Sequence, residues 1–516
     1  MAQGLLEATV EGGTVRGTAE GDLISFKGIP FAQPPVGDLR WRAPQPVKPW
    51  DGVLDASKMG PDPIQHYSLL KPGGTGAGGA SKGSEDCLYL NVWRPADQTG
   101  DPLPVMVWVH GGGDVQGAAS QYPMERFTRQ GGMVVVSFNY RLSRLGFFAH
   151  PALAAEAPDD PRGNYAFMDE IAALQWVQRN IAAFGGDPGT VTIAGESAGG
   201  GAMVAMLISP LASGLFHRAI VESPGMPSAR DGAFPLENLD AAESRAVEFA
   251  REAGIDGNDV KALAALRALP AEKVAEEGIG MSEVVTMAAG GPSAAGFSGP
   301  TIDGRLIAET SEAAMRGGRQ AMVPVICGAT AVDLAVSVAE TKDAVFAQFG
   351  ALASQARKLY DPDGNASFKA LNQAVYADRT MIEPTRHLAA VMTRAGQPAY
   401  YYRFSYVDEA YRDAVPGVIH GFEMPFVLDL PISFDGKGIV QIERKGADLE
   451  MVRTASGYWA NFVRTGDPNG AGLPEWPRYD PATGNVMDFA NTGAAAGPDP
   501  LKARLDLWQS VWDPAH

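Results

Sequence analysis

The chain has 516 residues, enough for a large core, and its 45% hydrophobic and 20% charged residues are ordinary for a globular protein. Acidic side chains outnumber basic ones by 60 to 42, and the net charge of -18 argues against sequence-independent binding to nucleic acid or anionic lipid. No secretory signal is visible, and the most apolar run, Val323 to Ala339, is too short to span a membrane. With only two cysteines as well, these features predict a cytoplasmic, reducing location.

The first part of the chain predicts strands. Residues 9–56 alternate short β-prone runs with turn signals, which indicates an antiparallel lead-in packed on a larger sheet. Residues 71–83 are Gly-rich and predict a flexible loop. Strands are predicted over residues 88–94, 105–110 and 133–140, and the last two are almost wholly apolar, as expected for strands covered on both faces by helices.

Strands and helices then alternate. We expect a helix over residues 164–184, a strand over 190–194, a helix over 198–208 and a strand over 218–222, an order typical of a parallel sheet. Residues 235–300 are interpreted as a cap-like insertion over the carboxyl edge of the sheet, since they begin as helix without alternating strands. Strands over 323–328 and 400–406 and a helix over 449–464 complete a single domain, residues 1–516.

Ser197 lies between a predicted strand and a predicted helix, in Gly195-Glu196-Ser197-Ala198-Gly199. This matches G-x-S-x-G, the nucleophile elbow, a sharp turn that lifts a serine above the end of a parallel sheet. A second match, Gly79 to Gly83, follows a Gly-rich run that cannot be a buried strand, so the context favours Ser197. A serine nucleophile needs a base, which an acid must orient. Four histidines follow Ser197 in the chain: His217, His387, His420 and His516.

Several motifs together resemble the type-B carboxylesterase family, the cholinesterase-like and para-nitrobenzyl-esterase-like branch of the α/β-hydrolases, and suggest a bacterial source. They are His110-Gly111-Gly112-Gly113, Asn139-Tyr140-Arg141-Leu142, the block from Gly163 to Gly200, and Gly417-Val418-Ile419-His420-Gly421-Phe422-Glu423. The resemblance implies an α/β-hydrolase fold: a mostly parallel twisted sheet, helices on both faces and an inserted helical cap.

By this resemblance Ser197 is the nucleophile and His420 the general base. The family acid lies a few residues past a strand in a D-E-G context, where this chain has Val332-Asp333-Leu334. Asp333 is therefore the candidate acid, with Glu340 and Asp303 as alternatives because the flanking pattern is lost. Activity should rise with pH as the imidazole loses its proton, near pH 6.5.

The family's oxyanion donors correspond to the backbone N–H groups of Gly112, Gly113 and Ala198, and His110 is expected to shape their loop. Ser223 falls where the family has a serine that supports the triad, although a buried serine could instead satisfy its own strand end. Glu196, next to the nucleophile, is likewise expected to support the triad without reacting itself. No cofactor and no metal are expected.

Two departures from the family are informative. Asp114 replaces the usual aromatic residue after the glycines and is a candidate substrate-pocket residue that would favour polar or cationic substrates; the alternative is a side chain turned to solvent or capping a turn. Cys87 matches a family cysteine whose disulfide partner is replaced by Pro63, so no disulfide is expected. Glu85 and Arg40 resemble the family's structural ion pair. The choline-site tryptophan is missing.

The sequence therefore predicts a serine carboxylesterase that hydrolyses small-molecule esters through an acyl-enzyme. The same residues could instead act on carbamates, amides or a specialised multi-ester natural product or xenobiotic. The alternative from a different functional class is a catalytically inactive cholinesterase-like protein that only binds a partner. Retention of Ser197, His420 and the glycines argues against it.

Overall fold

The computed structural model describes residues 6–65, 82–97, 100–158, 160–224, 236–276, 296–335, 337 and 339–513. Most of the predicted loop 71–83, part of the predicted cap 235–300 and His516 lie outside the described residues. In the described part of the chain, no helix is long and apolar enough to cross a membrane.

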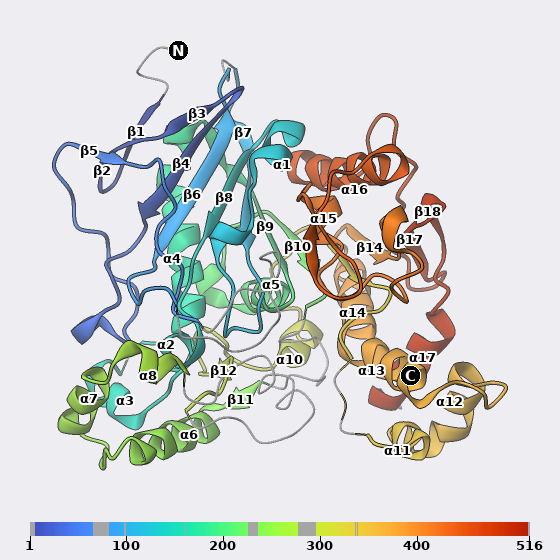
Figure 1. The fold of residues 1–516 in the computed structure, drawn as a ribbon. Helices are drawn as coiled ribbons and strands as arrows, with labels where there is room; N and C mark the ends of the chain where they lie inside the picture. The colour runs from blue at the N-terminus through green and yellow to red at the C-terminus, as the bar shows by residue number, and fades with distance from the viewer. Residues whose placement is uncertain are drawn as a thin grey trace.

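An eleven-stranded sheet organises the described residues (Figure 1). Seven neighbouring strands, from β17 to β8, pair in parallel, and antiparallel strands extend both edges, as predicted for a mostly parallel sheet. In spatial order the strands are β18 (Gly493–Pro498), β17 (Asn485–Ala490), β14 (Ala399–Phe404), β13 (Val325–Thr330), β10 (Arg218–Glu222), β9 (Gly186–Glu196), β7 (Leu103–Val109), β8 (Val134–Phe138), β6 (Tyr89–Pro95), β4 (Leu23–Pro30) and β3 (Thr18–Glu20).

Alternating side chains of the central strands build two cores, one on each face of the sheet. On β7, Val105, Val107 and Val109 belong to one buried cluster, whereas Met106 and Trp108 belong to the other. Successive side chains of a strand point to opposite faces, so an almost wholly apolar strand requires cover on both sides.

Helices supply that cover. The first face is packed by α4 (Tyr165–Asn180), α5 (Ala198–Ile208) and α14 (Glu383–Arg394), and the second by α1 (Glu125–Gly131) and α16 (Gly446–Thr465). Figure 1 shows α1 beside α16 at the upper edge of the molecule. Further α-helices in Figure 1, besides those of segment 235–300, are α2 (Ser143–Gly146), α3 (Pro151–Glu156), α10 (Ser311–Arg316), α11 (Lys342–Ala347), α12 (Ala353–Tyr360), α13 (Phe368–Ala377), α15 (Met424–Val427) and α17 (Lys502–Trp512).

The N-terminal lead-in forms two structures. The first is a small sheet of β1 (Glu7–Val10), β2 (Gly13–Arg16) and β5 (Val53–Asp55), in which β2 and β5 pair in parallel. The second is the antiparallel edge of the main sheet, formed by β3, β4 and β6. Two short two-stranded sheets, β11 (Glu237–Asn238) with β12 (Thr301–Ile302) and β15 (Ile432–Phe434) with β16 (Ile439–Gln441), complete the described strands.

The start of segment 235–300 is helical, as predicted. It contains α6 (Leu239–Glu252), α7 (Val260–Arg267) and α8 (Ala271–Glu276). These helices contact β12, α3 and α2, and Figure 1 shows them gathered with α3 below the sheet. They form a layer beside one end of the sheet.

Candidate active site

Ser197 is the single residue between the end of β9 and the start of α5. Its φ of 58° and ψ of -122° are unusual for a residue with a side chain, and such strain clusters at functional sites. A Cβ on Gly195 would lie 2.5 Å from the Gly199 carbonyl oxygen, and one on Gly199 would lie 2.2 Å from that of Val109. Both glycines are therefore needed for strand, turn and helix to approach this closely.

His420 lies between the serine and a carboxylate. Its Nε2 is 2.7 Å from Oγ of Ser197, and its Nδ1 is 2.6 Å from Oδ1 of Asp333. Asp333 follows β13, and a backbone bridge between Val332 and Ile419 joins its loop to the loop that carries His420. The bridge fixes the two loops against each other, so both side chains are held from neighbouring backbone positions.

Asp333 is buried and fully hydrogen-bonded. Oδ1 accepts a hydrogen bond from the Leu334 N–H, and Oδ2 accepts hydrogen bonds from Ser223 Oγ and the Thr330 N–H. Burial alone would raise the pKa of Asp333, but the charge of His420 and these hydrogen bonds outweigh it and lower the pKa. The carboxylate is thus ionised at neutral pH.

Neither alternative acid approaches His420. Asp303 accepts hydrogen bonds from the backbone N–H groups of residues 305–307 and from Asn164, and Glu340 is exposed. His217 and His387 also lie elsewhere, since they contact the Val191 N–H and Glu312 respectively.

The glycine loop after β7 lies directly against the serine. A Cβ on Gly111 would lie 2.6 Å from the Glu196 carbonyl oxygen and 3.0 Å from Cβ of Ser197. Gly112 and Gly113 adopt φ values of 117° and 65°, which glycine tolerates best. Within the described residues, the backbone N–H groups of Gly112, Gly113 and Ala198 donate to no acceptor. They remain available to an oxygen bound at Ser197.

His110 supports this loop. Its Nδ1 is 2.9 Å from the Gly111 carbonyl oxygen, its ring stacks on Tyr140 at 4.3 Å, and the Tyr140 hydroxyl donates to the His110 carbonyl oxygen. Burial lowers the pKa of His110 to about 4, so the ring is neutral at physiological pH and unsuited to carry a proton there.

Three buried glutamates surround the triad. Glu196 Oε1 lies 3.3 Å from His420 Nε2, Glu222 Oε1 accepts a hydrogen bond from Trp459, and Glu423 Oε1 accepts one from Ser223. Burial raises the pKa of each of these carboxyls. Sequence reasoning assigned no role to Glu222 and Glu423, although each lies within a motif, next to Ser223 and three residues after His420.

The glutamates also act on the histidine. Burial by itself would lower the pKa of His420, but the negative charges of Glu196 and Asp333 outweigh it and raise the pKa above its ordinary value of 6.5. The pH at which His420 becomes neutral, and hence able to accept a proton, is therefore higher than the sequence alone suggests.

A cavity of about 110 Å³ opens beside Ser197 and His420. Apart from Ser197 and His420, its wall is largely apolar and includes Tyr122, Phe422, Met424 and Ile439, with Gln121 and Glu196 as polar residues. This composition suits an acyl or alkyl group more than a charged one.

Asp114 does not line this cavity. It is 6% exposed, has a φ of 62°, and accepts a hydrogen bond from the Ser143 N–H through its backbone oxygen. Burial raises the pKa of its carboxyl to about 7. The side chain is therefore neither turned to solvent nor at the rim of the cavity beside Ser197.

The structure contains the ion pair that the family resemblance implied. Arg40 and Glu85 form a two-point ion pair, with distances of 2.5 and 2.8 Å, and both cysteines are free and buried. Within the described residues, no group of three or more His, Cys, Asp or Glu side chains could hold a metal ion.

Comparisons with known proteins identify the family of the chain. The sequence profile of the carboxylesterase family matches residues 5–508. The chain is 36% identical to fumonisin B1 esterase of Sphingopyxis macrogoltabida over 96% of this chain and 88% of that protein. It is 33% identical to liver carboxylesterase 1 of Oryctolagus cuniculus over 97% and 93% of the two chains.

Among solved structures, a PNB esterase superposes with a TM-score of 0.80 at 30% identity, covering 97% of this chain and 99% of that one. The sheet order and the helices on both faces are those of its α/β-hydrolase fold. The chain therefore belongs to the carboxylesterase family and is a serine-dependent carboxylic ester hydrolase.

Proposed function

We propose that Ser197, His420 and Asp333 are the catalytic residues. As Ser197 Oγ bonds to the carbonyl carbon of the ester, its proton passes to His420 Nε2. The tetrahedral intermediate then collapses, the ester bond breaks, and the leaving alkoxide takes that proton. Water repeats the sequence to release the acid and regenerate Ser197. The observation that carries this proposal is the unbroken chain of contacts at 2.7 and 2.6 Å.

The negative charge of the tetrahedral intermediate would be held by the backbone N–H groups of Gly112, Gly113 and Ala198. Their lack of acceptors within the described residues and their place beside Ser197 support this role. Each such donor typically contributes about 10²- to 10³-fold in rate.

The apolar cavity beside Ser197 favours neutral esters with a short or medium acyl chain. A second candidate is an ester of a larger natural product or xenobiotic, because one relative at 36% identity is named a fumonisin B1 esterase. Carbamates and amides pass through the same kind of tetrahedral intermediate. In all of these reactions the chemistry at Ser197 is the same, and only the fit of the substrate differs.

Specificity would depend on the segments near the sheet's carboxyl edge. We assign residues 235–300 as a cap-like insertion of one domain, residues 1–516. The helices α6, α7 and α8 support this assignment. The two free buried thiols are consistent with a reducing, cytoplasmic compartment.

Hydrolysis of p-nitrophenyl esters from acetate to octanoate tests the proposal. Ser197→Ala should abolish turnover, while Ser213→Ala, at an exposed serine, should leave it unchanged. If the wild type cleaves short-chain esters but not long-chain esters, the chain length at which turnover stops gives the size of the acyl cavity. Wild type that takes up an organophosphate yet cleaves none of these esters would favour the larger substrate. Wild-type turnover that survives Ser197→Ala would refute Ser197 as the nucleophile.

A further inference from the structure

The side chain of Gln65 is buried and holds the backbone of Gly117 at two points. Its Nε2 donates to the Gly117 carbonyl oxygen at 2.8 Å, and its Oε1 accepts a hydrogen bond from the Gly117 N–H at 2.8 Å. Nε2 also donates to the Pro63 carbonyl oxygen at 3.1 Å. Turning the amide over would set its NH₂ group against the Gly117 N–H, so these contacts allow only one orientation of the amide.

Gly117 closes the loop that carries the oxyanion donors. It has a φ of 109°, and a Cβ there would lie 2.3 Å from the Gly111 carbonyl oxygen and 2.4 Å from Nδ1 of His110. The preceding residue, Gln116, donates its N–H to the Gly112 carbonyl oxygen at 3.2 Å. Because these backbone groups are already in close contact, a displacement of Gly117 would also displace Gly111 and Gly112.

The backbone that carries Gln65 is itself held in place. Gln65 and Lys82 exchange two backbone hydrogen bonds, at 2.9 and 3.0 Å. Asn139 makes a second connection to the glycine loop, since its Nδ2 donates to the Pro61 carbonyl oxygen and its Oδ1 accepts a hydrogen bond from the Ala119 N–H. The chain around Gln65 is therefore a fixed support from which the amide can hold Gly117.

We propose that Gln65 is a positioning residue for ester hydrolysis: by holding Gly117 it keeps the N–H groups of Gly112 and Gly113 where the oxyanion forms. The inference rests on the role proposed above for these N–H groups. Such donors stabilise the tetrahedral intermediate only when they already point at the developing charge, and a small misplacement can cost about 100-fold in rate. Gln65 does not line the cavity beside Ser197, so it acts on kcat and not on substrate binding.

Gln65→Met tests this inference in the full chain, because methionine has a similar length but makes none of the three hydrogen bonds. On p-nitrophenyl acetate we expect kcat to fall about 10- to 100-fold while KM stays within about twofold of the wild-type value. Gln65→Glu keeps an acceptor for the Gly117 N–H but turns an oxygen toward the Gly117 carbonyl oxygen. It should therefore lower kcat as well, and it provides a second variant of nearly unchanged shape.

Inhibition by trifluoroacetophenone measures the oxyanion donors directly. Ser197 Oγ bonds to the ketone carbon, the hydroxyl proton passes to His420 Nε2, and the ketone oxygen becomes the oxyanion. Since this adduct resembles the tetrahedral intermediate, its Ki in Gln65→Met should rise by about the factor by which kcat/KM falls. A residue that only stabilises the fold would not produce this match.

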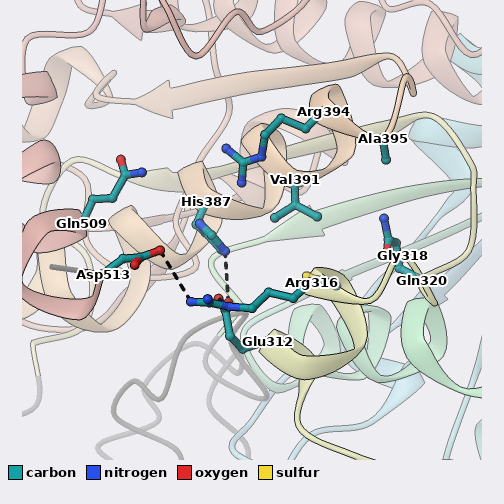
Figure 2. Close-up of a pocket in the computed structure, with 11 residues that line it drawn as sticks. Glu312, Arg316, Gly318, Gln320, His387, Val391, Arg394, Ala395, Gln509 and Asp513 are labelled. Atoms are coloured by element: carbon teal, nitrogen blue, oxygen red, sulfur yellow. Dashed lines mark hydrogen bonds and ion pairs between the residues drawn. The ribbon is translucent and has the colours of Figure 1, made fainter. Parts of the chain in front are cut away.

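Two glutamines provide matched controls. Gln178→Met removes two hydrogen bonds to backbone carbonyl oxygens, those of Pro188 and Leu215, and should lower the melting temperature without changing kcat. Gln509→Met, at a half-buried glutamine, should also leave kcat unchanged. Gln509 lines a separate cavity of about 590 Å³ between α10, α14 and α17 (Figure 2), which shares no lining residue with the cavity beside Ser197.

Wild-type kcat and Ki in either folded Gln65 variant would overturn the inference, and so would a change confined to KM or to the melting temperature. Ser197→Ala separates this failure from a failure of the proposed function. Turnover that survives Ser197→Ala refutes the catalytic role of Ser197, whereas turnover that depends on Ser197 but not on Gln65 refutes the positioning role alone.

Discussion

Ser223 donates a 2.7 Å hydrogen bond to Oδ2 of Asp333, the oxygen that does not contact His420. Ser223 follows β10 with a φ of 41°, and its own N–H donates to the Gly328 carbonyl oxygen. Its hydroxyl therefore hydrogen-bonds to the carboxyl groups of Asp333 and Glu423 and not to the backbone at the end of β10. We interpret Ser223 as a positioning residue that fixes the rotation of the Asp333 carboxylate.

Ser223→Ala should lower kcat about 5- to 30-fold with little change in KM, because one hydrogen bond to a buried carboxylate is lost. Steady-state kinetics on p-nitrophenyl acetate measures this. Ser298→Ala removes another buried hydroxyl, which contacts the Gly299 carbonyl oxygen, and should leave kcat unchanged. An unchanged kcat in Ser223→Ala would show that Thr330 and Leu334 suffice to hold Asp333.

Asp333→Asn should lower kcat about 10³- to 10⁴-fold while the protein stays folded, since an amide can hold His420 in the wrong tautomer. Glu340→Gln and Asp303→Asn are the matched controls. Glu340 is exposed and Asp303 caps a backbone turn, so neither change should alter kcat of the folded protein. A comparable loss in Glu340→Gln, with Asp333→Asn still active, would reassign the acid.

The features predicted best from the sequence are those with local signals. The helix Ala198–Ile208 and the strand Arg218–Glu222 match the structure residue for residue, because small apolar residues and β-branched residues there give unambiguous patterns. Asp333 could be placed only through a family resemblance, since the carboxylate reaches His420 by a loop pairing, Val332 with Ile419, that no local pattern encodes.

Features built from distant segments could not be predicted. Glu423 meets Ser223 only when β10 and the His420 loop are brought together, and Glu222 meets Trp459 only when α16 packs on the sheet. The burial of Asp114 depends on the packing of the glycine loop against residues 140–143, which composition does not reveal. The cavity between α10, α14 and α17 likewise exists only in the folded chain.

The rising limb of kcat/KM against pH should have its midpoint above pH 6.5, because Glu196 and Asp333 stabilise the protonated form of His420. When the pKa of His420 is raised, its neutral form, which is the form that can accept a proton from Ser197, becomes populated only at higher pH. Glu196→Gln removes one of these charges and should move the midpoint to lower pH. Glu222→Gln, at a buried glutamate that hydrogen-bonds to Trp459 instead of contacting His420, should move it less. Equal midpoints for Glu196→Gln and the wild type would contradict this account.

Both cysteines should titrate as thiols. Cys87 and Cys327 are free, and burial raises the pKa of each thiol, so the reactive thiolate is scarce in the folded protein. Ellman's reagent should report two thiols per chain in denaturant without reductant, and react far more slowly with the native protein. Fewer than two thiols in denaturant would indicate oxidation of Cys87 or Cys327.

Asp114→Asn should stabilise the protein at neutral and alkaline pH. Burial raises the pKa of Asp114 in the folded state to about 7, above its ordinary value of 3.8. Between these values the unfolded chain releases the proton while the folded chain keeps it, so wild-type stability falls as pH rises from about 4 to about 7. Asparagine has no such titration and tolerates a positive φ, so the variant should gain about 1–3 kcal/mol in the free energy of unfolding at pH 8 and nothing near pH 4.

Urea unfolding of the wild type and Asp114→Asn at pH 4, 6 and 8 measures this difference. The ranking of neutral against cationic esters should stay the same in the variant, because Asp114 does not line the cavity beside Ser197. A variant that is less stable at pH 8 would mean that the carboxylate makes a favourable interaction in the fold. A selective loss of activity on cationic esters would instead return Asp114 to substrate recognition, through a movement of the glycine loop that brings its side chain toward Ser197.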